Sequence, residues 1–438
     1  MWLNDVLYFL RNYVEFALVE LTKREPWQWF LFVFPFFVFG ETPRYIIPAL
    51  LAPILDRLGV GRTSPARVRA FLDSQPSVSV IVAAHNEEER IVDNIRSLLE
   101  LDYPALEIVV VDDGSTDRTW ELARPFADQG RIKLVRNTGA GGRGGRPFAT
   151  NLGLRAAGGQ FIISVDADTT FDLGTVRRIL APFADPRVGA VSGNLKVRNR
   201  DDNALTACQA CEYLESITLW KTWTSMLGTL LQASGAFGAY RRDALEAVGA
   251  WDPELAEDAD LSSKLRKVGF KIRFARDAVA FTDVPVGLAG LTRQRMRWAQ
   301  GFIRTYYRKH LDAMDFRRFD AANFWELLIE FLMTFVMPLA AIAYVLLMLV
   351  FLPKFLPLVL VMTYVIYVVT NVFLTLSGLS LSERRGEEWG LLWYALVTPV
   401  YKAYLCWVRV YGCTMELLRR RYTDPYLPEQ VWREVPRW

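Results

Sequence analysis

The sequence predicts an α/β fold, with a doubly wound and mostly parallel sheet inserted between N-terminal and C-terminal transmembrane helices. Two observations carry this prediction. Apolar runs with the length of buried strands alternate with segments of helical spacing over residues 77–320. Such alternation is typical of parallel sheets that are covered by helices on both faces. Long apolar runs flank this region on both sides, and about 20 apolar helical residues cross the hydrocarbon of a bilayer.

The composition favours a chain that is partly embedded in a membrane. Of its 438 residues, 52% are hydrophobic and 23% are charged, which excludes a disordered chain and is slightly too apolar for a purely soluble one. The 51 basic and 48 acidic residues give a net charge of +3, too balanced for a protein that binds nucleic acid by bulk charge. Cys208 and Cys211 lack a second pair and are expected to be buried core thiols.

Residues 1–56 are predicted to hold the N-terminal amphipathic and transmembrane helices. Residues 1–22 mix charged and apolar positions, which favours a helix that lies on a membrane surface. Residues 27–55 are apolar apart from Glu41, Arg44 and a few prolines, and we expect one anchoring span there. The linker over residues 57–76 is polar and basic, so the positive-inside rule places it on the cytoplasmic side. The domain that follows is therefore expected to be cytosolic.

Buried strands are predicted at residues 78–83, 107–111, 133–136 and 161–165. Ligands of doubly wound folds bind beyond the carboxyl ends of the strands, and acidic side chains gather at these ends here. Glu87 comes shortly after the first strand, and Asp113 follows the second within the sequence DDGS. Helix capping and turn formation explain each of these two residues as well as ligand binding does.

Asp166 and Asp168 follow the strand over residues 161–165. Two carboxylates held together at the end of a buried strand repel each other unless a positive charge compensates them. Oxygen ligands of this kind suit Mg²⁺ or Mn²⁺, which also bridge a diphosphate and stabilise its departure. The alternative is a solvated loop, and we favour the metal.

Two further groups carry chemistry in the second half of the domain. Asp258, in the sequence AEDADLS, has the position of an acid in the first turn of a helix, where the helix dipole alone explains it. Gln294, Arg297 and Trp298 offer an amide, a cation and a flat aromatic face on one stretch of helix. Such a set can bind a sugar, and the alternative is an anchor at the membrane surface.

Residues 321–418 are predicted to form the C-terminal transmembrane and interfacial helices. Spans are expected over residues 324–352 and 355–379. A third apolar run, over residues 391–417, is broken by Pro399, and three spans would place three arginines at 419–421 on the far side of the membrane. We therefore expect two spans and one helix in the membrane plane. The tail over residues 419–438 is expected to be cytosolic, either as a mobile lid or as a simple tail.

Taken together and in order, these groups resemble a known family. The sequences VSVIVAAHNEEE, VVVDDGSTD, VDADTT, AWDPELAEDADLS and RQRMRWAQG are similar to those of the processive, inverting family-two glycosyltransferases of membranes. This family includes the cellulose, chitin and hyaluronan synthases, and the poly-β-1,6-N-acetylglucosamine synthases are the most similar branch. The resemblance covers residues 78–304 and implies a glycosyltransferase domain of the GT-A type.

The resemblance assigns the donor side of the site. Glu87 and Asp113 match positions that hold the uridine part of a nucleotide-sugar, and Asp166 matches one that contacts the nucleotide. Asp168 would carry the Mn²⁺ or Mg²⁺ ion. Arg146 stands where relatives often have lysine, and its guanidinium is still able to bind phosphate.

The resemblance also assigns the reaction and the acceptor side. Asp258 would be the general base, and Arg297 would lie near the diphosphate as a further donor-binding residue. Gln294 and Trp298 would bind the acceptor, with the sugar lying on the indole. Asn194 matches a position near the acceptor path.

The function that this resemblance implies is an inverting, processive β-glycosyltransferase of the inner (plasma) membrane. It would polymerise a sugar from a nucleotide-diphosphate-sugar, UDP-N-acetylglucosamine or UDP-glucose, and pass the polysaccharide across the membrane. The implied partners are the donor, the growing polysaccharide, membrane lipid and a small membrane subunit, with no nucleic acid. One alternative is transfer of a single sugar to a lipid acceptor. Another, from a different class, is a transporter or a catalytically inactive scaffold, and the retained aspartates argue against it.

Overall fold

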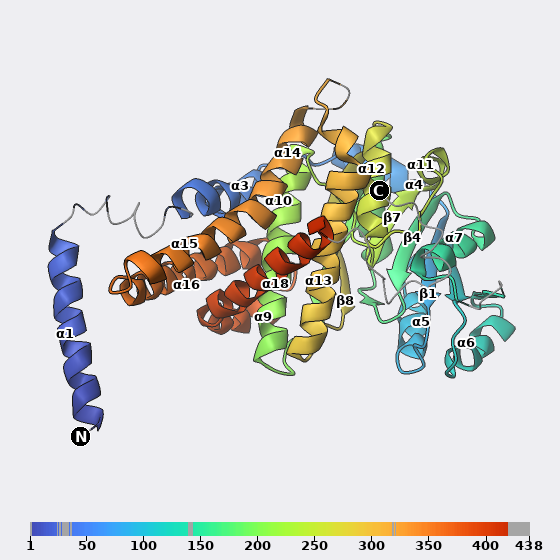
Figure 1. The fold of residues 1–438 in the computed structure, drawn as a ribbon. Coiled ribbons are helices and arrows are strands. Elements are labelled where there is room, and N and C mark those ends of the chain that lie inside the picture. The colour runs from blue at the N-terminus through green and yellow to red at the C-terminus, as the bar shows by residue number, and fades with distance from the viewer. Residues whose placement is uncertain are drawn as a thin grey trace.

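A computed structural model gives the fold, which Figure 1 shows as a ribbon. It describes residues 2–23, 25, 28, 35, 37–138, 143–317, 319 and 321–418. The predicted tail and lid over residues 419–438 lie outside this description, and so do residues 27, 29–34 and 36 of the predicted N-terminal span over residues 27–55.

An eight-stranded sheet forms the centre of the domain, with strand order β3-β2-β1-β4-β7-β6-β8-β5. The strands are β1 (Val78–Ala84), β2 (Leu106–Asp112), β3 (Lys133–Arg136), β4 (Phe161–Asp166), β5 (Thr170–Phe171), β6 (Val188–Val197), β7 (Phe237–Arg241) and β8 (Lys271–Thr282). β1 pairs in parallel with β2 and β4, and β2 pairs in parallel with β3. This confirms the predicted parallel half, in which each strand ends within one residue of its expected range. The other half is mixed, because β7 and β5 run against their neighbours.

The two faces of β1 are covered by different helices, as the doubly wound prediction requires. Val80 and Val82 share a core with Ile91 and Ile95 of α5 (Ile91–Leu99), while Ile81 lies in the core on the opposite face, under α7 (Arg146–Ala156). Consecutive strand residues point to opposite faces, so a strand that is buried on both sides needs an unbroken apolar run. The helices of the domain are α4 (Pro65–Asp73), α5 (Ile91–Leu99), α6 (Thr119–Asp128), α7 (Arg146–Ala156), α8 (Thr175–Leu180), η2 (Ala181–Ala184), α9 (Ala204–Tyr213), η3 (Leu214–Leu219), α10 (Trp220–Leu227), α11 (Arg242–Val248), α12 (Glu257–Lys267), α13 (Leu288–Arg304), η4 (Thr305–Lys309) and η5 (Leu311–Met314).

Glycines allow two close approaches within this domain. A Cβ on Gly153 of α7 would lie 2.4 Å from Cγ2 of Ile81, and one on Gly193 of β6 would lie 2.0 Å from Cδ1 of Phe237. Carbon atoms in contact are about 3.5–4.0 Å apart, so neither position has room for a side chain. The first glycine brings α7 close to β1, and the second brings the ring of Phe237 onto β6.

Among the described residues, two helical segments of the C-terminal region are long and apolar enough to cross a membrane. The first consists of α14 (Ala321–Phe331), η6 (Leu332–Val336) and α15 (Met337–Phe351), and the second is α16 (Leu356–Leu381). They coincide with the two predicted spans as long apolar helices, and Figure 1 shows α15 and α16 projecting away from the sheet. The helices α17 (Arg385–Glu388), η7 (Trp389–Leu396) and α18 (Thr398–Leu418) follow, with a bend of 75° that matches the predicted break near Pro399. They add a third candidate if the bent pair counts as one span.

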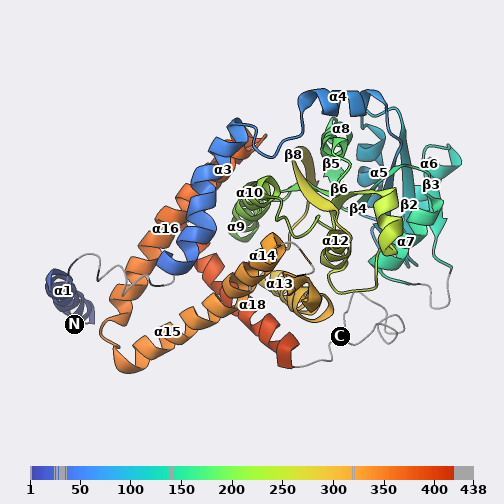
Figure 2. The ribbon, with the colours of Figure 1, turned by 90° about the horizontal axis from the view of Figure 1, so that it is seen from above.

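The N-terminal helices lie against this C-terminal region. In α1 (Trp2–Thr22), Tyr13 donates its hydroxyl to the carbonyl oxygen of Lys354 at 3.0 Å. The segment η1 (Phe37–Ile46) continues into α3 (Ile47–Arg57), and Figure 2 shows α3 lying along α16. Ala49 and Ala52 of α3 share a core with Leu374 of α16. The N-terminal segment and the second candidate span therefore pack as one layer.

Candidate active site

A cavity of about 580 Å³ lies between the sheet and the helices α9, α10, α12 and α13. It brings together residues that are far apart in the sequence. The predicted site residues that line it are Arg146, Asp166, Asp168, Asp258, Gln294, Arg297 and Trp298. These residues come from the start of α7, the end of β4, the start of α12 and the middle of α13. The four segments converge, as predicted from the sequence.

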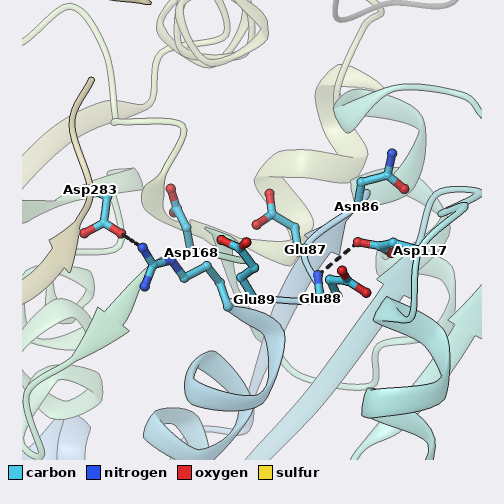
Figure 3. Close-up of a pocket in the computed structure, with 8 residues that line it drawn as sticks. Asn86, Glu87, Glu88, Glu89, Asp117, Asp168 and Asp283 are labelled. Carbon is cyan, nitrogen blue, oxygen red and sulfur yellow. Dashed lines mark hydrogen bonds and ion pairs between the residues drawn. The ribbon is translucent and has the colours of Figure 1, made fainter. Parts of the chain in front are cut away.

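A second, smaller cavity of about 440 Å³ adjoins the first at Asp168 and Asp283, which line both. Its walls are mostly acidic, and Figure 3 shows Glu87, Asp117, Asp168 and Asp283 around it. Glu87 belongs to the turn between β1 and α5, and its N–H donates to Thr119 Oγ1 of α6 at 2.7 Å. The structure therefore places Glu87 beside the Asp166–Asp168 pair, at the same edge of the sheet.

The carboxylates of these cavities are close enough to perturb one another. Burial, together with the neighbouring Asp166, raises the pKa of Asp168 to about 6. Burial, together with Asp168 and Asp166, raises the pKa of Glu87 to about 7. Each raised pKa means that ionising the carboxyl group costs free energy, because desolvation and like charges both favour the protonated acid. A positive ligand would relieve that cost.

Arg146 joins three parts of the larger cavity. Its Nε donates to Asp166 at 2.7 Å, one terminal nitrogen donates to Glu257 at 2.5 Å, and the other donates to the carbonyl oxygen of Gly235 at 2.5 Å. Burial alone would lower the pKa of Arg146, but the carboxylates of Asp166 and Glu257 outweigh burial and raise it. Arg146 is therefore a fixed cation that ties β4, α12 and the segment before β7 together.

Asp258 lies in the first turn of α12 with its carboxylate held by backbone groups. One oxygen accepts the N–H of Gly235 at 2.9 Å, and the other accepts the N–H of Ala259 at 2.8 Å. The adjacent Glu257 belongs to the Arg146 cluster; burial raises its pKa, while Arg146 and Arg297 act in the opposite direction. A carboxylate with about four acceptor positions keeps capacity for a ligand after two backbone bonds.

Asp113 has a different environment from the other residues that are predicted to bind the nucleotide-sugar. Its carboxylate is buried and accepts the N–H groups of Gly144 and Gly145, at 2.8 and 2.7 Å, and the side-chain amide of Asn137 at 2.8 Å. These bonds fix the end of the glycine-rich segment immediately before Arg146. Asp113 therefore connects β2 to the start of α7, and it lines neither of the two cavities.

Asn194 is not brought to the cavity. Its side chain is fully buried, its amide nitrogen donates to the carbonyl oxygen of Arg276 at 2.9 Å, and its amide oxygen accepts the hydroxyl of Thr218 at 3.1 Å. The register of β6 against β8 shifts between Gly193 and Asn194, and the amide satisfies backbone and hydroxyl groups at this irregularity. In this structure the side chain of Asn194 stabilises β6. It has no exposed surface that could contact an acceptor.

On α13, Trp298 is 43% exposed at the cavity, and its neighbour Arg295 lies over the indole with 4.0 Å between the guanidinium carbon and the ring centroid. Arg295 also donates to Gln294 Oε1 at 2.7 Å and to Glu212 at 2.7 Å. Neither Arg295 nor Glu212 was predicted as a site residue from the sequence. The signal for Arg295 was its spacing of three residues from Trp298, which places the two side chains on one side of a helix.

Lys221 is a further cavity residue, and it was not predicted from the sequence. It lies on α10 with little exposed surface, and its Nζ donates to Ser192 and Ser234 at 2.9 and 2.5 Å. Burial lowers its pKa to about 8, against the attraction of Asp258. Because Ser234 precedes Gly235, Lys221 supports the backbone that holds Asp258.

The larger cavity does not end at the edge of the sheet where Asp166 and Asp168 lie. It continues to Glu326, Glu330 and Thr334 of the first candidate span and to Arg409 of α18. Polar side chains therefore line a continuous cavity from Asp168 to the helices that are apolar enough to cross a membrane.

Comparison with known proteins agrees with this geometry. Residues 76–301 match Glycosyltransferase like family 2. A poly-β-1,6-N-acetyl-D-glucosamine synthase of Staphylococcus epidermidis is 34% identical over 226 residues, which are 51% of this chain and 54% of the relative. The synthase of Staphylococcus aureus is 31% identical over 265 residues, 58% of this chain and 63% of the relative. The chain thus spans between half and two thirds of the length of these curated relatives.

A solved structure shares the fold. The mannosyltransferase of Pyrobaculum calidifontis, in complex with GDP-Man and Mn²⁺, superposes with a TM-score of 0.54 at 24% identity, over 81% of this chain and 96% of that chain. The predicted GT-A type of fold is therefore confirmed, with a sheet that mixes parallel and antiparallel pairs. Because the family match covers residues 76–301, more than half of the chain, the protein belongs to Glycosyltransferase like family 2 and is a glycosyltransferase.

Proposed function

We propose that the protein transfers a sugar from a nucleotide-diphosphate-sugar to a saccharide acceptor with inversion, and that repeated transfer elongates a β-linked polysaccharide. One observation carries this proposal: Asp258, Asp166, Asp168 and Trp298 line the same cavity of about 580 Å³. A base, donor-binding acids and an aromatic platform are the groups that such a transfer needs. The relatives' printed names support UDP-N-acetylglucosamine as the first donor to test, with UDP-glucose as the alternative.

Asp258 is proposed to take the proton of the acceptor hydroxyl. As the hydroxyl oxygen bonds to the anomeric carbon, the bond between that carbon and the diphosphate oxygen breaks, and the diphosphate leaves with the bonding electrons. A single displacement of this kind converts an α-linked donor into a β-linked product. The backbone N–H groups of Gly235 and Ala259 fix the carboxylate, so no side-chain reorientation is needed at the moment of proton transfer.

The donor is proposed to lie along the acidic edge, with its nucleotide near Glu87 and Asp166. Asp113 orders the segment that carries Arg146, and Arg146 and Arg297 supply positive charge in the larger cavity. A guanidinium that is fixed before the donor arrives stabilises the developing charge of the leaving diphosphate without reorganisation.

The residues present fit a divalent cation. Among the described residues, no group of three or more histidine, cysteine, aspartate or glutamate side chains could hold a metal alone, but Mg²⁺ and Mn²⁺ sites of this type use one or two carboxylates and the phosphates of the substrate. Asp168, with Asp166 beside it, offers such carboxylates in a cavity where the charges repel each other. When bound there, the cation would supply Lewis-acid stabilisation of the leaving diphosphate.

The acceptor is proposed to lie on Trp298 and Gln294 and to continue toward Glu330 and Arg409. The cavity leads from the base into the layer of candidate spans, which supports export of the product through a multi-pass protein of the inner membrane with a cytosolic catalytic domain. A small membrane subunit stays a prediction, and membrane lipid is the expected surrounding of α15 and α16.

The test is transfer by the purified full chain in detergent, with a panel of uridine- and guanosine-diphosphate sugars and with Mn²⁺ or Mg²⁺. Asp258→Asn should lower turnover by about 10²–10⁴ and leave donor binding nearly unchanged, because a general base contributes about that factor. The matched control is Asp243→Asn on α11, where the carboxylate also accepts the N–H of the next residue at 2.8 Å. Normal turnover in Asp258→Asn would refute the assignment of the base.

Product size separates the two forms of the proposal. A ladder or a high-mass product from one donor supports elongation. A single lipid-linked sugar contradicts elongation and supports the alternative of transfer to a lipid. No release of nucleotide diphosphate with any donor would support the inactive scaffold.

A further inference from the structure

We propose that Arg295 is the positioning residue of the acceptor subsite, acting through Trp298 and Gln294. This inference rests on the proposed function and assigns a role to a residue that the motif Gln-x-x-Arg-Trp leaves unspecified. Arg295 is 6% exposed in the middle of α13. A charge that is buried to this extent needs partners that compensate its desolvation, so its contacts indicate what it holds.

Arg295 is anchored by a mostly buried carboxylate of another helix. Its Nη2 donates to Glu212 Oε2 of α9 at 2.7 Å, and the same oxygen accepts the hydroxyl of Tyr401 of α18 at 2.5 Å. The guanidinium is therefore fixed by side chains of two other helices, 83 residues before it and 106 residues after it. A planar group that is fixed at one edge is a suitable support for an aromatic ring.

The other contacts of Arg295 reach the two predicted acceptor residues. Its guanidinium carbon lies 4.0 Å from the ring centroid of Trp298, within the range of a cation–π interaction. One face of the indole is thereby covered, although the side chain stays 43% exposed at the cavity. The ring is held in one orientation, and its remaining surface is available to a sugar.

Gln294 is oriented by the same guanidinium. Its Oε1 accepts from Arg295 Nη1 at 2.7 Å, so the oxygen end of the amide is turned toward Arg295. The amide nitrogen is then the end that can donate to a hydroxyl or acetamido oxygen of the acceptor. Arg295 thus fixes both the aromatic platform and the hydrogen-bond donor beside it, and Glu212 sets the position of Arg295.

The experiment compares Arg295→Lys with Arg304→Lys in the purified full chain. Lysine keeps the positive charge next to Glu212 but loses the planar fork and the flat stacking surface. Arg304 is a matched control on the same helix, 15% exposed and paired with Glu254 at 3.4 Å. The readouts are the KM for a soluble N-acetylglucosamine oligosaccharide as acceptor, the KM for the donor, kcat and the apparent Tm.

We expect Arg295→Lys to raise the acceptor KM about tenfold, because a cation–π contact and a hydrogen bond are lost. The donor KM should change less than twofold, and Arg304→Lys should leave both constants near those of the wild type. Glu212→Gln keeps the acceptor oxygen for Arg295 and Tyr401, so a smaller increase of the acceptor KM is expected. Direct binding of the oligosaccharide to each variant, measured by calorimetry, should follow the same order.

Removing the residues on which Arg295 acts gives the decisive comparison. In a background that carries both Gln294→Ala and Trp298→Ala, Arg295→Lys should add less than twofold to the acceptor KM, because both side chains that it orients are gone. If the changes multiply independently, or if donor and acceptor KM rise together, the role of Arg295 is structural and the inference is overturned while the proposed function stands. A wild-type chain that transfers sugar from no donor overturns the proposed function itself, and this inference with it.

Discussion

Replacing Arg146 by methionine should destabilise the glycosyltransferase domain more at high pH than at low pH. The guanidinium bonds to Asp166, Glu257 and the carbonyl oxygen of Gly235, and methionine offers neither a donor nor a charge. The side chain of Asp166 is 38% exposed, so water can replace the arginine there at little cost. Glu257 is 13% exposed and would be left as a buried carboxylate.

The expected size follows from these exposures. Removing one partner of a buried ion pair costs about 3–5 kcal/mol, and for a domain of about 150–250 residues each kcal/mol lowers Tm by about 2–4 °C. We therefore expect a loss on the order of 10 °C at pH 8. Burial already raises the pKa of Glu257, and losing Arg146 raises it further. The cost applies while Glu257 is ionised, so it shrinks as the pH falls through that raised pKa.

The measurement is the apparent Tm of wild type and variant in detergent at pH 6 and pH 8. Arg242→Met is the matched control, because Arg242 is 26% exposed, against 24% for Arg146. Arg242 donates to the carbonyl oxygens of Gly159 and Ala157. Its ion partner Glu246, at 3.9 Å, is 64% exposed, so water replaces the arginine there at little cost and the loss of Tm in Arg242→Met should be the same at pH 6 and pH 8. An equal loss for both variants, or a loss for Arg146→Met that is the same at pH 6 and pH 8, would refute the reasoning.

Three further predictions concern the acidic edge and the packing of the sheet. Without a divalent cation, the Tm of the wild type should be higher at pH 6 than at pH 8. Burial and neighbouring acids raise the pKa of Glu87 to about 7, so protonation of Glu87 stabilises the fold at low pH and this contribution is lost as the pH rises through 7. Glu87→Gln should make Tm less dependent on pH. At pH 8, Mn²⁺ should raise Tm, and Asp168→Asn should remove that increase; an unchanged increase would place the cation elsewhere. Gly193→Ala should lower Tm by several degrees, because its Cβ would lie 2.0 Å from the ring of Phe237. Gly386→Ala is the control and should be close to neutral, because no atom lies within 4 Å of its Cβ. Equal Tm values for the two variants would contradict this account of the packing.

The first half of the sheet could be predicted because its strands are buried on both faces. A strand such as Val78–Ala84 shows an unbroken apolar run, which is a local signal. β6 and β7 carry Gly189, Gly193 and Gly238 within their ranges, and these glycines interrupt the pattern that predicts a strand. They are there because a ring or another chain segment approaches closely, and this is a property of the folded domain. The antiparallel insertion of β7 between β4 and β6 could not be read from residues that are near one another in the sequence.

The candidate site was predictable to the extent that its residues follow strands or belong to a motif. The acids after β1 and β4 could be placed at one edge from topology alone, whereas Asp258 was identified only by resemblance. The contacts that define the site join distant residues: Arg146 and Glu257 are 111 residues apart, and Glu212 and Arg295 are 83 apart. Spacing along the chain carries no information about such pairs. Asn194 was misplaced for the same reason, since the irregularity of β6 that buries it appears only when β8 is aligned beside it.

The charges of the site argue that the donor and a divalent cation bind together. Arg90 and Arg198 are both paired with Asp283, at 2.9 and 3.5 Å, and Arg146 is bonded to two carboxylates. An incoming diphosphate would have to compete with acids for each of these arginines, while it meets further carboxylates such as Asp168 on the walls of the smaller cavity. At contact distance this repulsion is on the order of several kcal/mol in a partly buried site. The arginines that are already paired compensate the protein's own carboxylates and leave the charge of the diphosphate uncompensated. A divalent cation, bound to the donor before it arrives or held by Asp168, would compensate that charge.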